Sequence, residues 1–482
     1  MPEEHIKQPI TLLPTVLVIF GANGNLSRNK LLPALYELLR KGRLPEKFTV
    51  VCILHSQQNS IDGIFEQVTE NIRRIHTDVD QRVLDRLKSI VMPLVMDGAN
   101  EQDYQVLSQT LDDLDTAYDV PCQRLFYLAI PPSLFPSIIQ NLTTHRLNDE
   151  SSGTARRILV EKPFGVDLPS AKELVRVMAT SFRETQIYRI DHYLAKQNVQ
   201  NILAFRFGNP LIEDIWGRQF IDCIQISALE QVGVDARGNF YEHMGALRDF
   251  IQSHLMQLMA LIMMETPNTL DSDSIHRGKF ALLQAVEVIK PSQIQEVAVR
   301  GQYDGYRDEV GNPASTTETY VALKLAVANS RWADVPVLLR TGKSLAKQVT
   351  EINVIFKDRS LKNLPANCLK IRIQPNEGIS IKLVAQAPGF EDNLQNVSMD
   401  FTYNASFKAA SPDAYERVLI DCITGDQSLF ASHEEVMRCW EILQPLIQYW
   451  EGSTEQPLPY QVAAAGPAAA DELASSVAVE WL

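Results

Sequence analysis

The sequence predicts two domains: an α/β domain with a doubly wound parallel sheet, followed by an α+β domain with a large, mostly antiparallel sheet. The chain has 482 residues, more than one hydrophobic core usually organises. In the first 195 residues apolar runs alternate with amphipathic stretches, as in parallel sheets. Beyond about residue 200 the strand-like runs are separated by hairpin-like spacers instead. We therefore expect one domain over residues 1–195 and a second over residues 196–482.

The first elements are a strand, a glycine turn and a helix. Residues 15–20 (TVLVIF) form a continuous apolar run that leads into Gly21, which is typical of a buried parallel strand. Leucines at helical spacing predict a helix over residues 31–41, and Pro33 must lie in its first turn or kink it. Further strands are expected over residues 48–54, 124–130 and 157–160, and in the second domain over 220–227, 320–325, 351–356 and 369–373.

Composition excludes several classes of function. A formal charge of −14 disfavours binding to nucleic acid or to an anionic membrane surface. An anionic substrate would need a local cationic pocket. The six cysteines are scattered without metal-ligand spacing, so we expect reduced structural thiols and no metal site. No signal or membrane-spanning segment is apparent, which predicts a cytoplasmic protein.

The turn after the first strand is the candidate nucleotide site. Its sequence is GANG, Gly21 to Gly24, followed by Asn25 and Leu26. The backbone amides of such a turn lie at a helix N-terminus, where they can face a pyrophosphate. The turn lacks the full GxGxxG spacing, and alone it is more often only a turn. The strand-turn-helix context favours a Rossmann-like dinucleotide-binding domain. We expect the cofactor to be bound by Gly21, Asn23, Gly24, Asn25 and Leu26.

The end of the second strand usually separates NAD from NADP. An acidic residue there holds the free ribose hydroxyl of NAD, and an arginine holds the 2′-phosphate of NADP. Here the place is taken by His55, Ser56, Gln57 and Gln58. His55 can donate to a phosphate when protonated, but histidine is only partly charged at neutral pH.

Three further motifs have chemically capable side chains: EKPFG (161–165), YRIDHYLAK (188–196) and GALRDFIQSHLMQ (245–257). With them the chain resembles the glucose-6-phosphate dehydrogenase family nearly end to end. The resemblance also covers RLFYLAIPPSLF (124–135), EQVGVDARG (230–238), ADVPVLLRTGKSL (333–345), IRIQPNEGI (371–379) and DAYERVLIDCITGD (413–426).

The resemblance implies an oxidoreductase. Its substrate would be β-D-glucose 6-phosphate, oxidised at C1 to 6-phosphogluconolactone, the first step of the oxidative pentose phosphate pathway. The hydride acceptor would be NADP, with NAD possible. The family also implies a homodimer or homotetramer, commonly formed through the sheet of the second domain.

Hydride removal from C1 needs a base for the hydroxyl proton, and His254 is the candidate. Taken alone, a histidine in an apolar helix is more often a buried core residue; the resemblance assigns the base to His254. Such a base needs an orienting carboxylate. Asp249 precedes His254 by five positions, roughly 140° around an α-helix, so Asp191 is the better partner, and the resemblance implies the same dyad.

The substrate residues follow from the resemblance. His192 and Tyr193 would grip the phosphate, with Lys196 between phosphate and sugar oxygens. Lys343 would reach the phosphate from the second domain, and Lys162 would touch both cofactor and substrate. Glu230 would bind sugar hydroxyls, although Lys343 and Glu230 could each, taken alone, be a solvated surface charge. We expect Asp249 to accept hydrogen bonds from sugar hydroxyls as well, with a salt bridge to a surface cation as the alternative.

Several positions depart from the family pattern: Asn25 replaces Asp, Ala195 replaces Gly, Gln197 replaces Glu, Ser253 replaces Asn, and His55 replaces the 2′-phosphate arginine. Ala195 should be tolerated if its backbone is not left-handed. Asn25 and His55 motivate a second hypothesis, a non-catalytic paralogue that binds sugar phosphate or a partner subunit. A Rossmann-type sugar oxidoreductase of another family is a third, which leaves the C-terminal matches unexplained.

Overall fold

The computed structural model describes residues 12–55, 61–75, 78–358, 366–389, 393–407 and 411–482. The chain divides into two compact units. The first comprises Met1–Gly165, Lys172–Ala195 and Pro412–His433, and the second comprises Val166–Ala171, Lys196–Ser411 and Glu434–Leu482.

Six parallel strands form the sheet of the first unit, in the order β3-β2-β1-β4-β5-β6. This is the strand order of doubly wound dinucleotide-binding folds, whose ligands bind beyond the carboxyl ends of the strands. The strands are β1 (Thr15–Phe20), β2 (Phe48–Leu54), β3 (Val91–Val95), β4 (Gln123–Leu128), β5 (Arg156–Glu161) and β6 (Ile187–Ile190).

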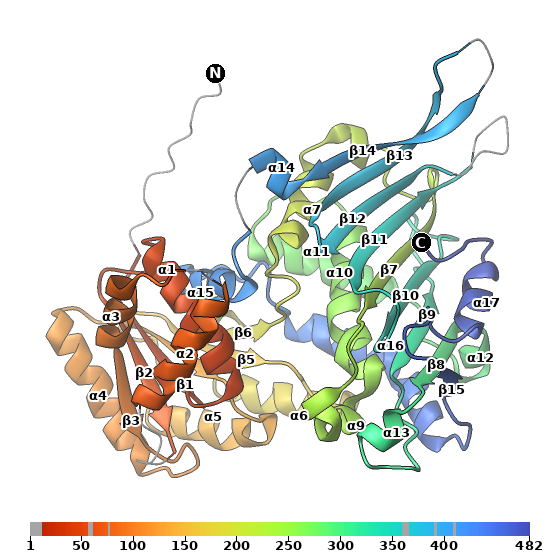
Figure 1. Cartoon of the computed structure of the whole chain (residues 1–482). Helices are drawn as coiled ribbons and strands as arrows, with labels where there is room; N and C mark the ends of the chain where they lie inside the picture. Colours follow the sequence, from red (N-terminus) through yellow and green to blue (C-terminus); the bar gives the residue numbers. More distant parts are fainter. Residues whose placement is uncertain (1–11, 56–60, 76–77, 359–365, 390–392, 408–410) are drawn as a thin grey trace. The chain divides into compact units, whose positions relative to one another are not determined.

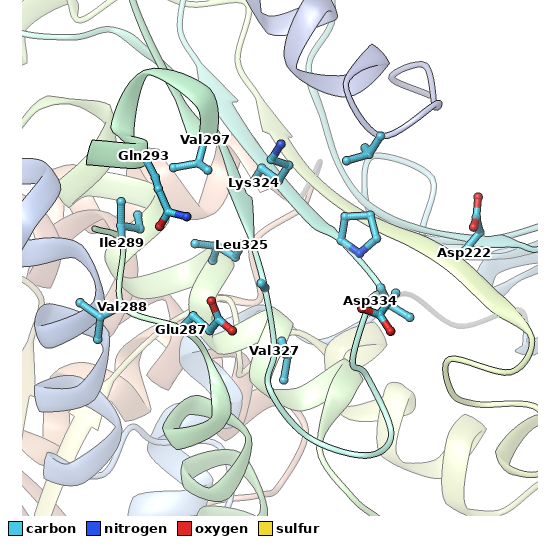
Figure 2. A pocket seen from close by; sticks show the side chains of 14 residues that line it. Asp222, Glu287, Val288, Ile289, Gln293, Val297, Lys324, Leu325, Val327 and Asp334 are labelled. Atoms are coloured by element: carbon cyan, nitrogen blue, oxygen red, sulfur yellow. The ribbon is translucent and has the colours of Figure 1, made fainter. Parts of the chain in front are cut away.

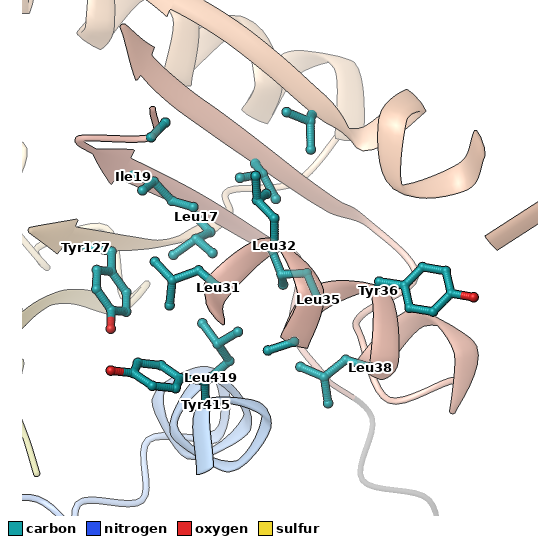
Figure 3. Close-up of a cluster of buried hydrophobic side chains, with 14 of the residues drawn as sticks. Leu17, Ile19, Leu31, Leu32, Leu35, Tyr36, Leu38, Tyr127, Tyr415 and Leu419 are labelled. Atoms are coloured by element: carbon teal, nitrogen blue, oxygen red, sulfur yellow. The ribbon is translucent and has the colours of Figure 1, made fainter. Parts of the chain in front are cut away.

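A leucine-rich helix covers one side of this sheet. A π-helical stretch, η1 (Ser27–Leu31), leads into α1 (Leu32–Arg40), and Pro33 lies in the first turn, where no amide hydrogen is missed. Figure 3 shows Leu31 and Leu32, where η1 passes into α1, beside Leu17 and Ile19 of β1. The other helices of this unit are α2 (Ile61–Ile75), α3 (Gln81–Ile90), α4 (Asp103–Tyr118), α5 (Phe135–Thr144) and α15 (Ala414–Thr424), and α6 (Leu168–Ala179) is shared between the units.

Nine strands form the sheet of the second unit, in the order β14-β13-β12-β11-β7-β10-β9-β8-β15 (Figure 1). Among the strand pairs of the described residues in this sheet, β7–β10 and β8–β15 are parallel and the others are antiparallel. The strands are β7 (Ile221–Leu229), β8 (Ala298–Tyr303), β9 (Tyr320–Leu325), β10 (Val337–Gly342), β11 (Val349–Phe356), β12 (Cys368–Gln374), β13 (Gly378–Gln386), β14 (Leu394–Thr402) and β15 (Leu458–Tyr460).

A nearly continuous helical segment packs on this sheet. It runs from α9 (Gly238–Ala246) through a π-helical stretch, η5 (Leu247–Leu255), into α10 (Met256–Met263), and η5 contacts β7 and β10. The other helices of the second unit are α7 (Gln197–Phe207), α8 (Pro210–Glu213), α11 (Ser272–Ala285), α12 (Ile294–Val297), α13 (Tyr306–Glu309), α14 (Tyr403–Phe407), α16 (His433–Gly452) and α17 (Ala469–Ser475). The first residue of α16, His433, is assigned to the first unit.

The predicted fold class is confirmed: a parallel, Rossmann-like sheet comes first, and a mostly antiparallel sheet follows. Every predicted strand is present within two residues at either end. In the described part of the chain, no helix is both long enough and apolar enough to cross a membrane. All six cysteines are buried, and none is joined in a disulfide.

Candidate active site

The glycine turn follows β1 directly and is built so that only glycine fits at its first position. Gly21 has φ +83°, and a Cβ there would lie 2.4 Å from the carbonyl oxygen of Ala129. The turn is closed by the Gly24 amide, which donates to the Gly21 carbonyl at 2.9 Å, and by the Ser27 hydroxyl, which donates to the same oxygen at 3.0 Å. Because Gly21 and Gly24 have no side chains, a pyrophosphate can approach the backbone at the start of the helix.

Other predicted residues of the first unit stand at the same edge of the sheet. Residue pairs in parallel register join Phe20 to Ile53 and Glu161 to Ile190. His55 follows β2 and is exposed, Lys162 follows β5 with a cis peptide bond to Pro163, and Asp191 follows β6. The carboxyl ends of parallel strands meet at one edge, so the topology places these side chains along the edge that begins with the glycine turn. Ser56, Gln57 and Gln58 lie outside the described residues.

Asp191 begins the predicted phosphate-binding segment and is buried, with 3% of its surface exposed. The Tyr193 amide donates to its Oδ1 at 3.0 Å, so the carboxylate fixes the start of this segment. The ring of His192 lies 5.0 Å from that of Tyr193 and stacks on that of Tyr415, with centroids 6.5 Å apart. Ala195 does not have a positive φ, so the methyl group that replaces the family's glycine is tolerated.

Glu161, the residue before Lys162, is a site feature that the sequence did not single out. The Tyr127 hydroxyl donates to Glu161 Oε1, and Figure 3 shows the hydroxyl of Tyr415 lying close to that of Tyr127. Burial raises the pKa of the Glu161 carboxyl to about 7. The nearby charge of Asp191 raises this pKa further, while hydrogen bonds from the two tyrosines lower it. The sequence signal that could have indicated Glu161 is its position as the first residue of the EKPFG motif.

In the second unit the structure brings Glu230 and Lys343 together. They follow β7 and β10, which are parallel and pair Leu229 with Gly342, so the two side chains leave the same sheet edge. Lys343 Nζ donates to Glu230 Oε2 at 2.6 Å. The ammonium group also lies 5.2 Å from the ring centroid of Tyr241, within the range of a cation–π contact.

Tyr241 is a second residue that the sequence did not indicate. It is fully buried, and burial raises the pKa of its hydroxyl well above the ordinary value. The carboxylates of Asp249 and Glu230 raise it further, as do Glu318 and Tyr460. Tyr241 therefore lies among the predicted sugar-binding carboxylates, and only the three-dimensional fold reveals this.

Asp249 and His254 both lie on η5, with 5% and 1% of their surfaces exposed. The Phe250 ring meets the His254 ring edge-on, with centroids 5.4 Å apart. Because η5 is π-helical, its hydrogen bonds join residues five apart, so Asp249 and His254 lie on nearly the same side. The angle of roughly 140° between Asp249 and His254, which assumed an α-helix, is therefore wrong. It no longer argues against Asp249 as the partner of His254, and the choice of Asp191 rests on the family resemblance.

Lys196 precedes α7 in the second unit, and its Nζ donates to Oε1 of Gln374 at the end of β12. The predicted residues are thus divided between the units. The first unit contains the glycine turn, His55, Lys162, Asp191, His192 and Tyr193, and the second contains Lys196, Glu230, Asp249, His254 and Lys343.

A cavity of about 490 Å³ in the second unit lies away from these residues. Figure 2 shows it lined by apolar side chains such as Ile289 and Leu325, with Asp222 and Asp334 at its margin. Asp222 and Asp334 stand near the beginnings of β7 and β10, whereas Glu230 and Lys343 follow their ends. A strand of six residues separates the two regions by roughly 20 Å. None of the predicted site residues lines this cavity.

A doubly wound sheet with a glycine turn after its first strand is typical of nucleotide-dependent oxidoreductases, and the lysine after β10 in the second unit suits an anionic substrate. The model of the glucose-6-phosphate dehydrogenase NAD binding domain matches residues 18–201, and that of the C-terminal domain of the same enzyme matches residues 203–482. The chain belongs to the glucose-6-phosphate dehydrogenase family.

Relatives support this membership over the whole length. A glucose-6-phosphate 1-dehydrogenase of Chlamydia pneumoniae is 40% identical, with 99% of this chain and 97% of that protein covered. The Bacillus subtilis enzyme of that name is 36% identical, with 97% and 98% covered. A solved glucose-6-phosphate dehydrogenase in complex with its substrate glucose-6-phosphate has a TM-score of 0.91 at 33% identity, with 98% of this chain and 99% of that chain covered.

Proposed function

We propose that this chain is a glucose-6-phosphate dehydrogenase that oxidises β-D-glucose 6-phosphate at C1 to 6-phosphogluconolactone, the first step of the oxidative pentose phosphate pathway. The observation that carries the proposal lies in the second unit. The helix bearing His254 and Asp249 packs on β7 and β10, the two strands that Glu230 and Lys343 directly follow. A proton acceptor and an anion-binding cation are therefore presented by adjoining elements.

His254 takes the C1 hydroxyl proton, and Asp191 orients its ring and stabilises the imidazolium. His192, Tyr193 and Lys196 bind the phosphate, with Lys343 as a second cation. Glu230 and Asp249 accept hydrogen bonds from sugar hydroxyls, and Lys162 serves both cofactor and substrate. Burial of His254 and Asp249 keeps bulk water from competing for these contacts.

The residues of the glycine turn fit a nicotinamide dinucleotide, which would supply the hydride acceptor. Gly21 lets the turn pass against the carbonyl oxygen of Ala129, which lies 2.4 Å from where a Cβ would stand, and the turn leads into the first amides of the helix, which can bind a pyrophosphate. Gly21, Asn23, Gly24, Asn25, Leu26 and Lys162 would hold the cofactor. We propose NADP as the usual acceptor, as the family resemblance implies. We propose that NAD is also used, because the residue after β2, where the 2′-phosphate would lie, is His55 rather than arginine.

The family resemblance further suggests a cytoplasmic homodimer or homotetramer assembled through the sheet of the second unit, and a division of roles between residues 1–195 and 196–482. The edge strand β14 suits such an interface, because Val397 and Met399 are 43% and 63% exposed. Multi-angle light scattering of the purified protein tests the assembly, and a monomer would contradict it.

The test of the function is the rise in reduced-nicotinamide absorbance with glucose 6-phosphate, run in parallel with NADP and NAD. We expect turnover with at least one of them, and a large loss of kcat/KM when glucose replaces glucose 6-phosphate. Absence of turnover with both nucleotides would contradict the proposal and favour a non-catalytic paralogue that binds sugar phosphate or a partner subunit.

A further inference from the structure

The segment before β9 touches both the helix of His254 and the strand end of Lys343. The helix meets this segment at a kink near the end of α9, where Gly245 has φ 65° and ψ 172°. Past the kink, the Ala246 amide donates to the carbonyl oxygen of Glu318 at 2.9 Å, and the Leu247 amide donates to Glu318 Oε1 at 3.1 Å. One residue thus accepts from two successive amides at the start of η5, which the helix itself leaves without partners.

The next residue, Thr319, holds Lys343. The Lys343 amide donates to the Thr319 carbonyl oxygen at 3.0 Å. The Tyr460 hydroxyl donates to the Lys343 carbonyl oxygen at 2.8 Å and lies 2.9 Å from Thr319 Oγ1. Thr319 itself is tied to β8, because its amide donates to Gly301 at 2.8 Å and its Oγ1 accepts from the Tyr303 amide at 3.0 Å.

Two consecutive residues therefore set the position of the proposed base relative to the proposed phosphate lysine. Their Cα atoms are about 3.8 Å apart across one rigid peptide unit, which leaves little freedom between the two contacts. Both residues are buried, with 6% of Glu318 and none of Thr319 exposed. A catalytic geometry depends on placements of this accuracy, since a shift of about 1 Å costs roughly a hundredfold in rate.

A buried carboxylate here needs a reason, because burial penalises the charged form and raises the pKa of Glu318. The Leu247 amide and the charges of Arg248 and Arg300 lower that pKa and so offset part of the penalty. The space is also tight: a Cβ on Gly245 would lie 2.3 Å from Glu318 Oε1. The carboxylate of Glu318 therefore occupies the space that a side chain at position 245 would need.

We propose that Glu318 is a positioning residue for the reaction, which ties the first turn of the helix bearing Asp249 and His254 to the strand end bearing Lys343. It acts through these groups and does not itself need to touch the substrate. The inference rests on the proposed roles of His254 and Lys343.

The test compares three substitutions of Glu318 in the full-length protein. Glu318→Ala removes the acceptor, Glu318→Asp keeps the charge but withdraws it from the Leu247 amide, and Glu318→Gln keeps an oxygen at the same reach without the charge. We expect kcat/KM for glucose 6-phosphate to fall at least tenfold in the first two, with lower kcat and higher KM. Glu318→Gln should stay within threefold of the wild type.

Two controls separate positioning from stability. Glu213 on α8 also accepts hydrogen bonds from several partners, among them Arg206 at 3.0 Å and Thr266 at 2.6 Å, but it has no contact with η5 or Lys343 among the described interactions. Glu213→Ala should lower the melting temperature and leave kcat/KM within twofold when assayed well below melting. The dissociation constant of reduced cofactor, measured by fluorescence, should be unchanged in every Glu318 variant.

An unchanged kcat/KM in folded Glu318→Ala would overturn the proposal, as would Glu318→Gln being as impaired as Glu318→Ala. If Glu318→Ala does not fold, Glu318→Asp decides, and wild-type kinetics there count against the proposal. The activity of the wild type on glucose 6-phosphate is measured before any variant is made. Its absence would contradict the proposed function and would not bear on the role of Glu318.

Discussion

At the scale of single residues, the chemistry depends on what burial does to ionisable groups. His254 is almost completely enclosed, with Phe250 at its ring edge and Asp249 on the same side of η5. Glu161 shares its surroundings with two tyrosines next to the proposed cofactor lysine. At Glu161 the local environment, more than the residue type, decides how the proton is held.

His254→Asn should lower kcat for glucose 6-phosphate by at least about a hundredfold, because a positioned general base contributes roughly 10²- to 10⁴-fold. The KM should change little, since the phosphate contacts remain. Steady-state kinetics measure both values. The matched control is His243→Asn, on the exposed side of the neighbouring helix α9, which should behave like the wild type. Unchanged turnover in His254→Asn would end its assignment as the base.

Glu161→Gln should change how stability depends on pH. Burial raises the pKa of Glu161 from 4.5 to about 7, so the folded protein binds this proton more tightly than the unfolded chain. The stabilisation is complete below pH 4.5 and is lost as the pH rises through 7. The free energy of unfolding of the wild type should therefore fall relative to that of Glu161→Gln, by at most about 3 kcal/mol.

Urea unfolding at pH 5, 6, 7 and 8 checks this expectation for both proteins. A constant difference in unfolding free energy across that range would show that the carboxyl of Glu161 does not titrate there.

At the scale of elements, the two site-bearing helices share a construction. Each begins after a glycine with positive φ, Gly21 before η1 and Gly245 before η5, and each contains a π-helical stretch. At both glycines a Cβ would lie closer than 2.5 Å to an oxygen atom. Such backbone is strained for other residues and typical of functional sites.

Gly21→Ala should weaken binding of reduced cofactor more than tenfold, because the new methyl group displaces the turn from the Ala129 carbonyl. It should also lower stability by about 1–3 kcal/mol. Gly42→Ala is the matched control: Gly42 has φ 62°, but nothing lies within 4 Å of its Cβ position. Fluorescence titration with the reduced cofactor should separate the two variants. Equal affinities would contradict the role of the turn.

At the scale of the whole molecule, the proposed site residues are divided between the two units. The glycine turn and His55 lie in the first unit together with His192 and Tyr193, whereas Glu230, Lys343 and His254, the proposed base, lie in the second. Cofactor choice should therefore respond to substitution of His55, and affinity for the sugar phosphate to substitution of Lys343.

Lys343→Gln should raise KM for glucose 6-phosphate at least tenfold and leave the dissociation constant of reduced cofactor unchanged. Glutamine keeps a hydrogen-bond donor but carries no charge, so the phosphate loses a cation.

His55→Arg should do the reverse, raising kcat/KM for NADP about tenfold without affecting NAD, because guanidinium binds phosphate in a bidentate manner. A change in glucose 6-phosphate KM in His55→Arg would contradict this separation.

Much of the fold could be predicted from local patterns. The apolar run 15–20, the glycine turn and the leucine spacing after it each specify an element over a few neighbouring residues, and Pro33 lies in the first turn as expected. The antiparallel strands of the second unit followed from alternation and spacers in the same way. Local sequence is sufficient to predict a helix, strand or turn whose stabilising contacts are between residues close together in the chain.

Where a structure depends on partners far along the chain, the sequence was silent or misleading. Residues 412–433 belong to the first unit, where Tyr415 stacks on His192. The spacing of Asp249 and His254 was interpreted with α-helical periodicity, but η5 is π-helical, and its first amides bond to Glu318, about 70 residues away in the chain. Tyr241 had no pattern of its own, and Glu161 was marked only by its position as the first residue of EKPFG.

The sequence by itself determined the family, the order of the elements and the chemical types of the site residues, since these depend on local propensity and on motifs. Only the tertiary structure decided which charges face each other, which groups are buried and where the helix of His254 begins. Those properties depend on desolvation and on contacts between distant segments, and neither can be read from neighbouring residues alone.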